Sequence, residues 1–152
     1  MFRKMTRKQN QLNDQESFQI LKNGRFGVLG TLSDNGYPYT IPLNFVYLNN
    51  KIYFHSAKIG HKIDNIQTNE KVSFTVVGEE SIIEAKLTSQ YKSVTLFGKA
   101  KVIPGNKEIL FELVKKYAKN VLDESKESIE QDYHHTSIIE IEIEHITGKQ
   151  ND

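Results

Sequence analysis

The segment 52–66, IYFHSAKIGHKIDNI, combines residue types and a spacing that could bind a phosphate group. It has the pattern of an apolar strand, a short polar turn and an amphipathic helix. A helix N-terminus presents backbone N–H groups that lack intrahelical partners, and it carries a partial positive charge. The side chains of His55, Ser56 and Lys62 could add donors at the same place. We therefore predict a phosphate site at this strand–helix junction.

A second candidate segment, 37–48 (YPYTIPLNFVYL), lies just upstream. Because Pro38 and Pro42 cannot donate to a β-ladder, this strand should lie at a sheet edge or be irregular near Pro42. One interpretation is an edge strand that its prolines keep soluble. The other is a strand whose unpaired N–H and C=O groups meet a planar heterocycle such as a flavin ring. The neighbouring phosphate site favours the flavin interpretation.

The histidines give little support for metal chemistry. His55 and His61 flank the same junction, but no cysteine and no clear third ligand accompany them, so we predict no metal site. His134 and His135 lie in a polar stretch and are expected to be exposed. His145 lies near the end of the last strand, where packing is the simpler role.

Several other chemistries are excluded by motif. The chain has no cysteine, which removes disulfides and thiolate sites. It contains no serine-nucleophile elbow, phosphate-binding Walker loop or Rossmann fingerprint. Gly24, Gly27 and Gly30 are regularly spaced, but they open a hairpin strand and do not join a strand to a helix, so they do not predict dinucleotide binding.

Length and charge indicate one soluble domain over residues 1–152. There are 20 basic and 19 acidic residues and no basic–aromatic motif, so we expect no nucleic-acid partner. No apolar stretch approaches the roughly 20 residues that span a bilayer, and no secretory signal follows the start, so we expect a cytoplasmic protein without membrane contact. Residues 1–12 form a basic N-terminal extension, interpreted as a solvated end.

Apolar periodicity and turn residues predict a mainly β, α+β fold, a small antiparallel barrel with flanking helices. Asn13 or Asp14 can cap the first helix, and Asn35–Gly36 predicts a tight turn with positive φ at both positions. Segment 78–90 is expected to be a surface loop, and 122–135 a loop or a short helix. The expected helices cover 13–23, 59–68 and 106–121, and the expected strands cover 26–32, 37–48, 51–55, 71–77, 91–103 and 137–146.

Four blocks follow one another along the chain: GRFGVLGTLSDNGYPYTIPLNFVY (24–47), IYFHSAKIGHK (52–62), YKSVTLFGKAKVI (91–103) and ITGK (146–149). In this order they resemble the FMN-binding split-barrel flavoproteins related to pyridoxamine 5′-phosphate oxidase. Within that family, the sequence is most similar to the 5-nitroimidazole resistance (Nim-type) proteins. The N-terminal RKMTRK also resembles the basic opening of that subgroup.

The resemblance implies a six-stranded split barrel that forms a homodimer, with two FMN molecules at the subunit interface. Residues along the isoalloxazine ring would be Thr40, Ile41, Pro42, Leu43 and Asn44. Phosphate and ribityl oxygens would be held by His55, Ser56 and Lys62, in a turn shaped by Ala57 and Gly60. The partner chain would close the site with Tyr91, Lys92, Ser93 and Val94.

The implied function is an FMN-dependent oxidoreductase that reduces a small aromatic or nitro compound. His55 is our candidate proton donor, although it could equally orient phosphate or pack at the strand end. The alternative is a split-barrel protein that holds a flavin or haem without catalysis. FAD or a deazaflavin in place of FMN also stays open. The arginine-rich phosphate clamp of pyridoxamine phosphate oxidases is not evident, so vitamin B6 oxidation is not expected.

Overall fold

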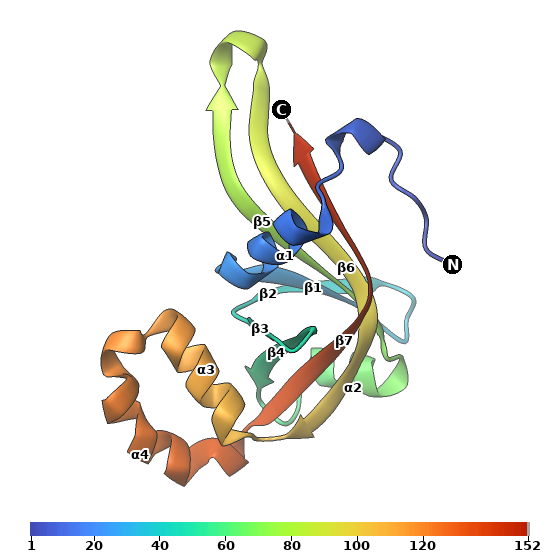
Figure 1. The fold of residues 1–152 in the computed structure, drawn as a ribbon. Helices are drawn as coiled ribbons and strands as arrows, with labels where there is room; N and C mark the ends of the chain where they lie inside the picture. Colours follow the sequence, from blue (N-terminus) through green and yellow to red (C-terminus); the bar gives the residue numbers. More distant parts are fainter. Residues whose placement is uncertain (152) are drawn as a thin grey trace.

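Seven antiparallel strands form one sheet in the computed structural model, which describes residues 1–151 (Figure 1). The order across the sheet is β2-β1-β5-β6-β7-β4-β3, so β2 and β3 are its edges and the barrel stays open. The predicted antiparallel split barrel is therefore confirmed. The strands are β1 (Gly27–Leu32), β2 (Pro38–Leu43), β3 (Val46–Leu48), β4 (Lys51–Ser56), β5 (Lys71–Ile83), β6 (Thr88–Pro104) and β7 (Ser137–Asn151).

Four α-helices flank the sheet in the described residues, and side chains cap two of them. Asn13 Oδ1 accepts a hydrogen bond from Glu16 N at 2.8 Å, and Asn106 Oδ1 accepts one from Ile109 N at 3.0 Å. Capping of this kind satisfies N–H groups that the helix leaves unpaired. The helices are α1 (Asp14–Asn23), α2 (His61–Thr68), α3 (Lys107–Tyr117) and α4 (Leu122–Asp132).

The main core lies on the inner face of the curved sheet. Phe45, Phe54 and Phe74 are fully buried there. Helix α1 adds Leu21 to this core, and α2 adds Ile63 with Ile66. Helix α3 packs on the other face and encloses a second cluster built from Val46, Ile109, Leu113 and Ile138. Burial of Ile63 and Ile66 thus holds α2, and with it the strand–helix junction after β4, against the core.

The predicted strand 37–48 is divided in two, which gives seven strands where six were expected. The backbone of Phe45 leaves the ladder and bonds to side chains of α3. Its N–H donates to Tyr117 Oη at 3.0 Å, and its carbonyl accepts from Lys116 Nζ at 3.0 Å. The prediction that this strand lies at an edge is confirmed, because β2 pairs only with β1.

The prediction of a surface loop over 78–90 is wrong. Strands β5 and β6 continue through it as a long hairpin with a short 3-10 turn, Glu84–Lys86, at its tip. Figure 1 shows this hairpin as an arm that extends beyond the barrel. The cross-strand hydrogen bonds supply the order that local composition does not indicate.

Other local features also differ from the sequence prediction. Helix α2 begins at His61 because Gly60, at φ 145°, is not helical, so Ile59 is 82% exposed and not part of the buried helix face. The pairing of β6 with β7 shifts register between Phe97 and Gly98. In the 33–36 turn only Gly36 has positive φ, so the expected positive φ at Asn35 is wrong.

Candidate functional site

The predicted phosphate turn lies between β4 and α2. Ser56 is 4% exposed, and its Oγ donates to the carbonyl of Ala57 at 2.9 Å. His55 is exposed, and Lys62 is half-buried in the first turn of α2. In contrast to α1 and α3, no side chain caps α2 within the described residues, since Gly60 occupies the cap position. Its first N–H groups are therefore available to an anion, which is the chemistry that a phosphate needs.

Successive residues of β4 point to opposite faces, which separates two of the predicted ligands. Ser56 is buried toward the inside, whereas His55 points outward beside its cross-strand neighbour Ile138. The two side chains therefore cannot contact the same group from one side of the strand. The predicted set of His55, Ser56 and Lys62 surrounds the turn but does not converge on one point.

A buried polar network ties α2 to the β1–β2 hairpin. The amide of Asn65 donates to Thr31 Oγ1 at 2.9 Å and to Ser33 Oγ at 3.2 Å. Ser33 Oγ also lies 3.0 Å from His61 Nε2, and the His61 ring lies 4.0 Å from the Tyr39 ring, centroid to centroid. These contacts place the end of the predicted phosphate turn against the start of the predicted flavin strand.

The sequence reasoning did not identify this network. His61 was considered only as a metal ligand, and Asn65 was not singled out. One signal was present in the sequence: Thr31 falls at an inward position in the alternation of β1, where an apolar side chain would be usual. A buried hydroxyl at such a position needs a partner, and Asn65 provides it.

The residues of β2 divide between two faces of the sheet. Ile41 and Leu43 pack on the inner core, while Thr40 and Pro42 point outward. Their only common surface is the free backbone edge of the strand. The prediction that 40–44 lie together along a flavin can therefore hold for the backbone, but not for all five side chains.

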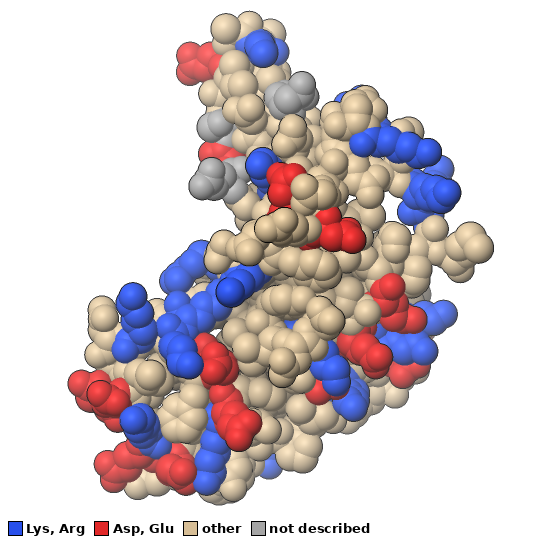
Figure 2. All heavy atoms as spheres, in the orientation of Figure 1, with Lys and Arg blue, Asp and Glu red and all other residues tan. Residues whose placement is uncertain are grey.

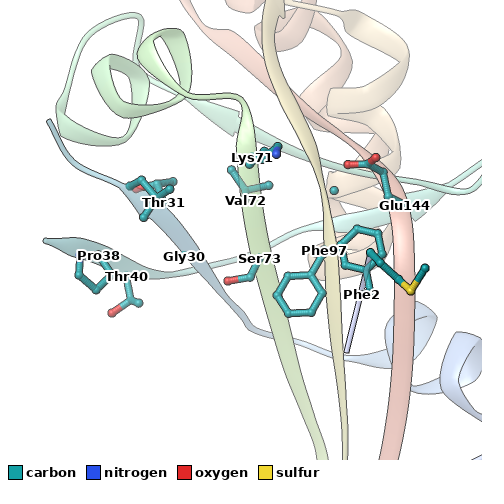
Figure 3. Close-up of a pocket in the computed structure, with 13 residues that line it drawn as sticks. Phe2, Gly30, Thr31, Pro38, Thr40, Lys71, Val72, Ser73, Phe97 and Glu144 are labelled. Carbon is teal, nitrogen blue, oxygen red and sulfur yellow. The ribbon is translucent and has the colours of Figure 1, made fainter. Parts of the chain in front are cut away.

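Thr40 lines a cavity of about 600 Å³ on the outer face. In Figure 3, Pro38 and Thr40 of β2 border it on one side, and Phe97 with Phe2 borders it on the other. The N-terminal Phe2 stacks on Phe97 and His145, with ring centroids 5.6 and 4.9 Å apart. His145 therefore packs, as expected. The N-terminal extension is anchored by Phe2, while its basic side chains stay exposed.

Tyr91, Lys92, Ser93 and Val94 lie on β6, away from these segments. Across the sheet, Val94 of β6 is in register with Leu43 of β2, with β5 and β1 between them. Three strand spacings separate the two residues, a distance of about 14 Å. Val94 is buried in the core. Lys92 Nζ lies 3.6 Å from Glu16 and lines a separate groove of about 750 Å³. Within one chain, this segment does not join the site.

The remaining histidines behave as the sequence indicates. His134 and His135 are exposed, and their rings lie 4.0 Å apart. In the described part of the chain, no group of three or more His, Cys, Asp or Glu side chains could hold a metal ion. No helix among the described residues is long and apolar enough to span a membrane.

The sequence profile of the pyridoxamine 5′-phosphate oxidase family matches residues 13–150. The chain belongs to this family. No curated protein matches the sequence. The match covers β1 to β7, and so it includes the turn, the edge strand and the groove described above.

Solved structures show the same fold. A candidate 5-nitroimidazole antibiotic resistance protein from Bacteroides thetaiotaomicron is 22% identical, with 92% of this chain and 86% of that chain covered and a TM-score of 0.75. An FAD-binding protein from Mesorhizobium loti is 25% identical, with 93% and 97% covered and a TM-score of 0.66. The FAD and heme binding protein from Mycobacterium smegmatis is 16% identical, with 94% and 74% covered and a TM-score of 0.79.

Proposed function

We propose that this protein is an oxidoreductase that binds FMN and reduces a small aromatic or nitro compound. The observation that carries the proposal is the junction of two elements. The uncapped N-terminus of α2 meets the free edge strand β2 where the His61 ring contacts the Tyr39 ring. An anion site and a row of free backbone groups therefore adjoin, as a phosphate joined to a planar ring requires.

Different residues of the chain would bind the phosphate and the ring of the flavin. The N–H groups at the start of α2, with Lys62, would hold the phosphate, and the edge of β2 would offer hydrogen bonds to the ring from 40 to 44. When bound, the flavin supplies the redox chemistry by accepting two electrons from a donor and passing them to the substrate. His55, exposed one residue before the turn, is the side chain we propose as proton donor.

A second copy of the chain would complete the site. The outward residues at 28–32 of β1, 38–42 of β2, 73–77 of β5 and 93–97 of β6 include no charged side chain. A neutral, partly apolar face that extends over four strands is suited to pairing with another copy of the chain. In such a homodimer, Tyr91 to Val94 of the second copy would reach the flavin. These residues are too far away within one chain.

The first experiment is an absorption spectrum of the purified protein, with the released cofactor identified by mass. Flavin absorption bands and about one FMN per chain would support the proposal. Release of FAD would show that the cofactor is FAD and not FMN. Lys62→Gln should weaken FMN binding, while Lys126→Gln on α4, where the lysine pairs with Asp123, should not. A colourless protein that takes up no added flavin would refute the flavin assignment.

Turnover needs its own measurement. The flavin-loaded protein, once chemically reduced, should be reoxidised faster by nitroaromatic compounds than free FMN is. His55→Gln should slow this step without changing the amount of flavin bound. A protein that binds flavin but reoxidises no faster than free FMN would support the alternative, a flavin-holding protein without catalysis.

A further inference from the structure

Arg25 and Lys116 form a pair of cations at the end of β2 that lies away from the phosphate turn. The Lys116 Nζ lies 3.9 Å from the centroid of the Phe45 ring, and Arg25 Cζ lies 4.8 Å from the centroid of the Tyr117 ring. Arg25 Nη1 also reaches the carbonyl of Lys116 at 3.5 Å. The two charged groups are thus held by aromatic faces and backbone oxygens on adjoining residues.

The surrounding bonds fix this pair firmly. Tyr117 Oη lies 2.7 Å from the carbonyl of Arg25 and 3.0 Å from that of Phe45. The amide of Asn44, which directly follows β2, donates to the carbonyl of Arg25 at 3.0 Å. Hydrogen bonds therefore join the segment before β1 and the segment after β2 to the end of α3 at one corner. A preorganised arrangement of this kind keeps the cost of ligand binding low.

In the part of the chain that the structure describes, no acidic side chain forms an ion pair with either cation. Burial, together with the charge of Arg25, lowers the pKa of Lys116 to about 8. Figure 2 shows Lys and Arg side chains gathered along the hollow between α1 and α3. An anion placed here would relieve the repulsion between the two cations.

The adjoining groove indicates what else the ligand carries. Arg25 lines the groove of about 750 Å³ together with the apolar side chains of Ile20, Phe26 and Val28. Because Val28 also belongs to the sheet face proposed to pair with a second copy, the groove would lie at the border of that interface. Tyr39 marks the phosphate end of β2, and Asn44 lies five residues farther, roughly 17 Å in an extended strand. The cation pair is therefore distinct from the predicted phosphate position. Arg25 lines this largely apolar groove, and Lys116 lies next to Arg25, an arrangement that fits an aromatic anion.

We propose that Arg25 and Lys116 bind the carboxylate or phosphate group of a small aromatic ligand whose ring lies in the adjoining groove. This inference rests on the proposed function for one point only, that the ligand is the compound reduced or the electron donor. Recognition of the anionic group itself requires no cofactor. Two fixed cations on one side of a ligand form charge-assisted hydrogen bonds, which are stronger than neutral ones.

The test follows the Lys116 ammonium group by NMR while sodium benzoate or inorganic phosphate is added to the purified protein. Either anion should raise the pKa of Lys116 toward its ordinary value. Arg25→Gln and Lys116→Gln should each weaken benzoate binding roughly 10- to 100-fold. Lys115→Gln is the matched control, because Lys115 is the neighbouring lysine on α3 but pairs with Glu112 at 3.2 Å. It should leave benzoate binding unchanged.

Further experiments identify the compound that carries the anionic group, and they distinguish failure of the anion site from failure of the proposed flavin function. Preference for 4-nitrobenzoate over 4-nitrobenzamide in reoxidation would assign the site to the substrate, whereas competition by a nicotinamide dinucleotide would assign it to the donor. If FMN itself displaces phosphate from Lys116, the site belongs to the cofactor and the inference is overturned. Flavin binding without any anion effect on Lys116 would also overturn it, while leaving the proposed function intact.

Discussion

Glu140 is 8% exposed on β7, and its Oε1 lies 3.2 Å from Lys51 Nζ and 3.4 Å from Lys101 Nζ. Burial by itself raises the pKa of Glu140. Hydrogen bonds from Lys51 and Tyr53, with the charges of both lysines, outweigh this effect, and the net pKa is lowered. A carboxylate with a lowered pKa stabilises the fold above its unfolded value of 4.5, and this contribution is lost as the pH falls through the folded pKa.

We therefore expect Glu140→Gln to lower the free energy of unfolding at neutral pH by about 1–2 kcal/mol, since its lysine partners are partly exposed. The variant should also lose part of the acid sensitivity that the native protein shows below about pH 4.5. Urea unfolding across this pH range measures both effects. Glu142→Gln, at an exposed position on the same strand, is the control. Equal acid sensitivity in the native protein and Glu140→Gln would contradict the assignment.

At the scale of elements, the turn between β4 and α2 depends on one backbone conformation. Gly60 has φ 145° and ψ 172°, a region that other residues rarely adopt. A Cβ on Gly60 would meet no atom within 4 Å, so any effect of a substitution comes from the backbone alone. The direction in which the first N–H groups of α2 point follows from this conformation.

Gly60→Ala should cost about 1–3 kcal/mol of stability and should also weaken FMN binding, because the turn must relax to another conformation. Gly36→Ala is a matched control. Gly36 also has positive φ, at 86°, and open space around its Cβ position, but it lies in the β1–β2 turn. Gly36→Ala should lose stability without a comparable loss of FMN affinity. Urea unfolding and FMN titration of both variants make the comparison, and equal FMN affinity in the two would contradict it.

At the scale of the whole molecule, the outer face of β2, β1, β5 and β6 is the surface on which the proposed homodimer depends. Val28 lies in this face and is 43% exposed in the single chain, and Val77 is 55% exposed. A neutral, partly apolar surface gains free energy when a second copy covers it. A substitution that separates the two copies should therefore also abolish FMN binding.

Val28→Lys should raise the dimer dissociation constant at least about 100-fold, because burying an unpaired ammonium group costs several kcal/mol. The variant should also lose FMN. Val121→Lys, at a 49% exposed position outside this face, should change neither property. Sedimentation equilibrium and flavin content provide the measurements. A native protein that is monomeric yet binds FMN would disprove the dimeric site.

Much of the fold could be predicted from the sequence because local patterns determine it. Alternation of apolar and polar residues indicated the strands, and Asn13 and Asn106 mark the starts of α1 and α3 through their own side chains. Pro42 indicated an edge strand, since a proline cannot complete a ladder. Residue types and spacing also marked 37–48 and 52–66 as the candidate binding segments, and their binding role stays a prediction.

The tertiary structure decided what depends on residues far apart in the sequence. Phe45 leaves the sheet because Lys116 and Tyr117, about 70 residues later, satisfy its backbone groups. His61 meets Tyr39 because Asn65 bonds to Thr31 and Ser33 across the fold. The Arg25–Lys116 pair arises in the same way. Local propensity indicates the elements, but long-range packing and hydrogen bonding fix which of them meet, and no periodicity in the chain encodes those contacts.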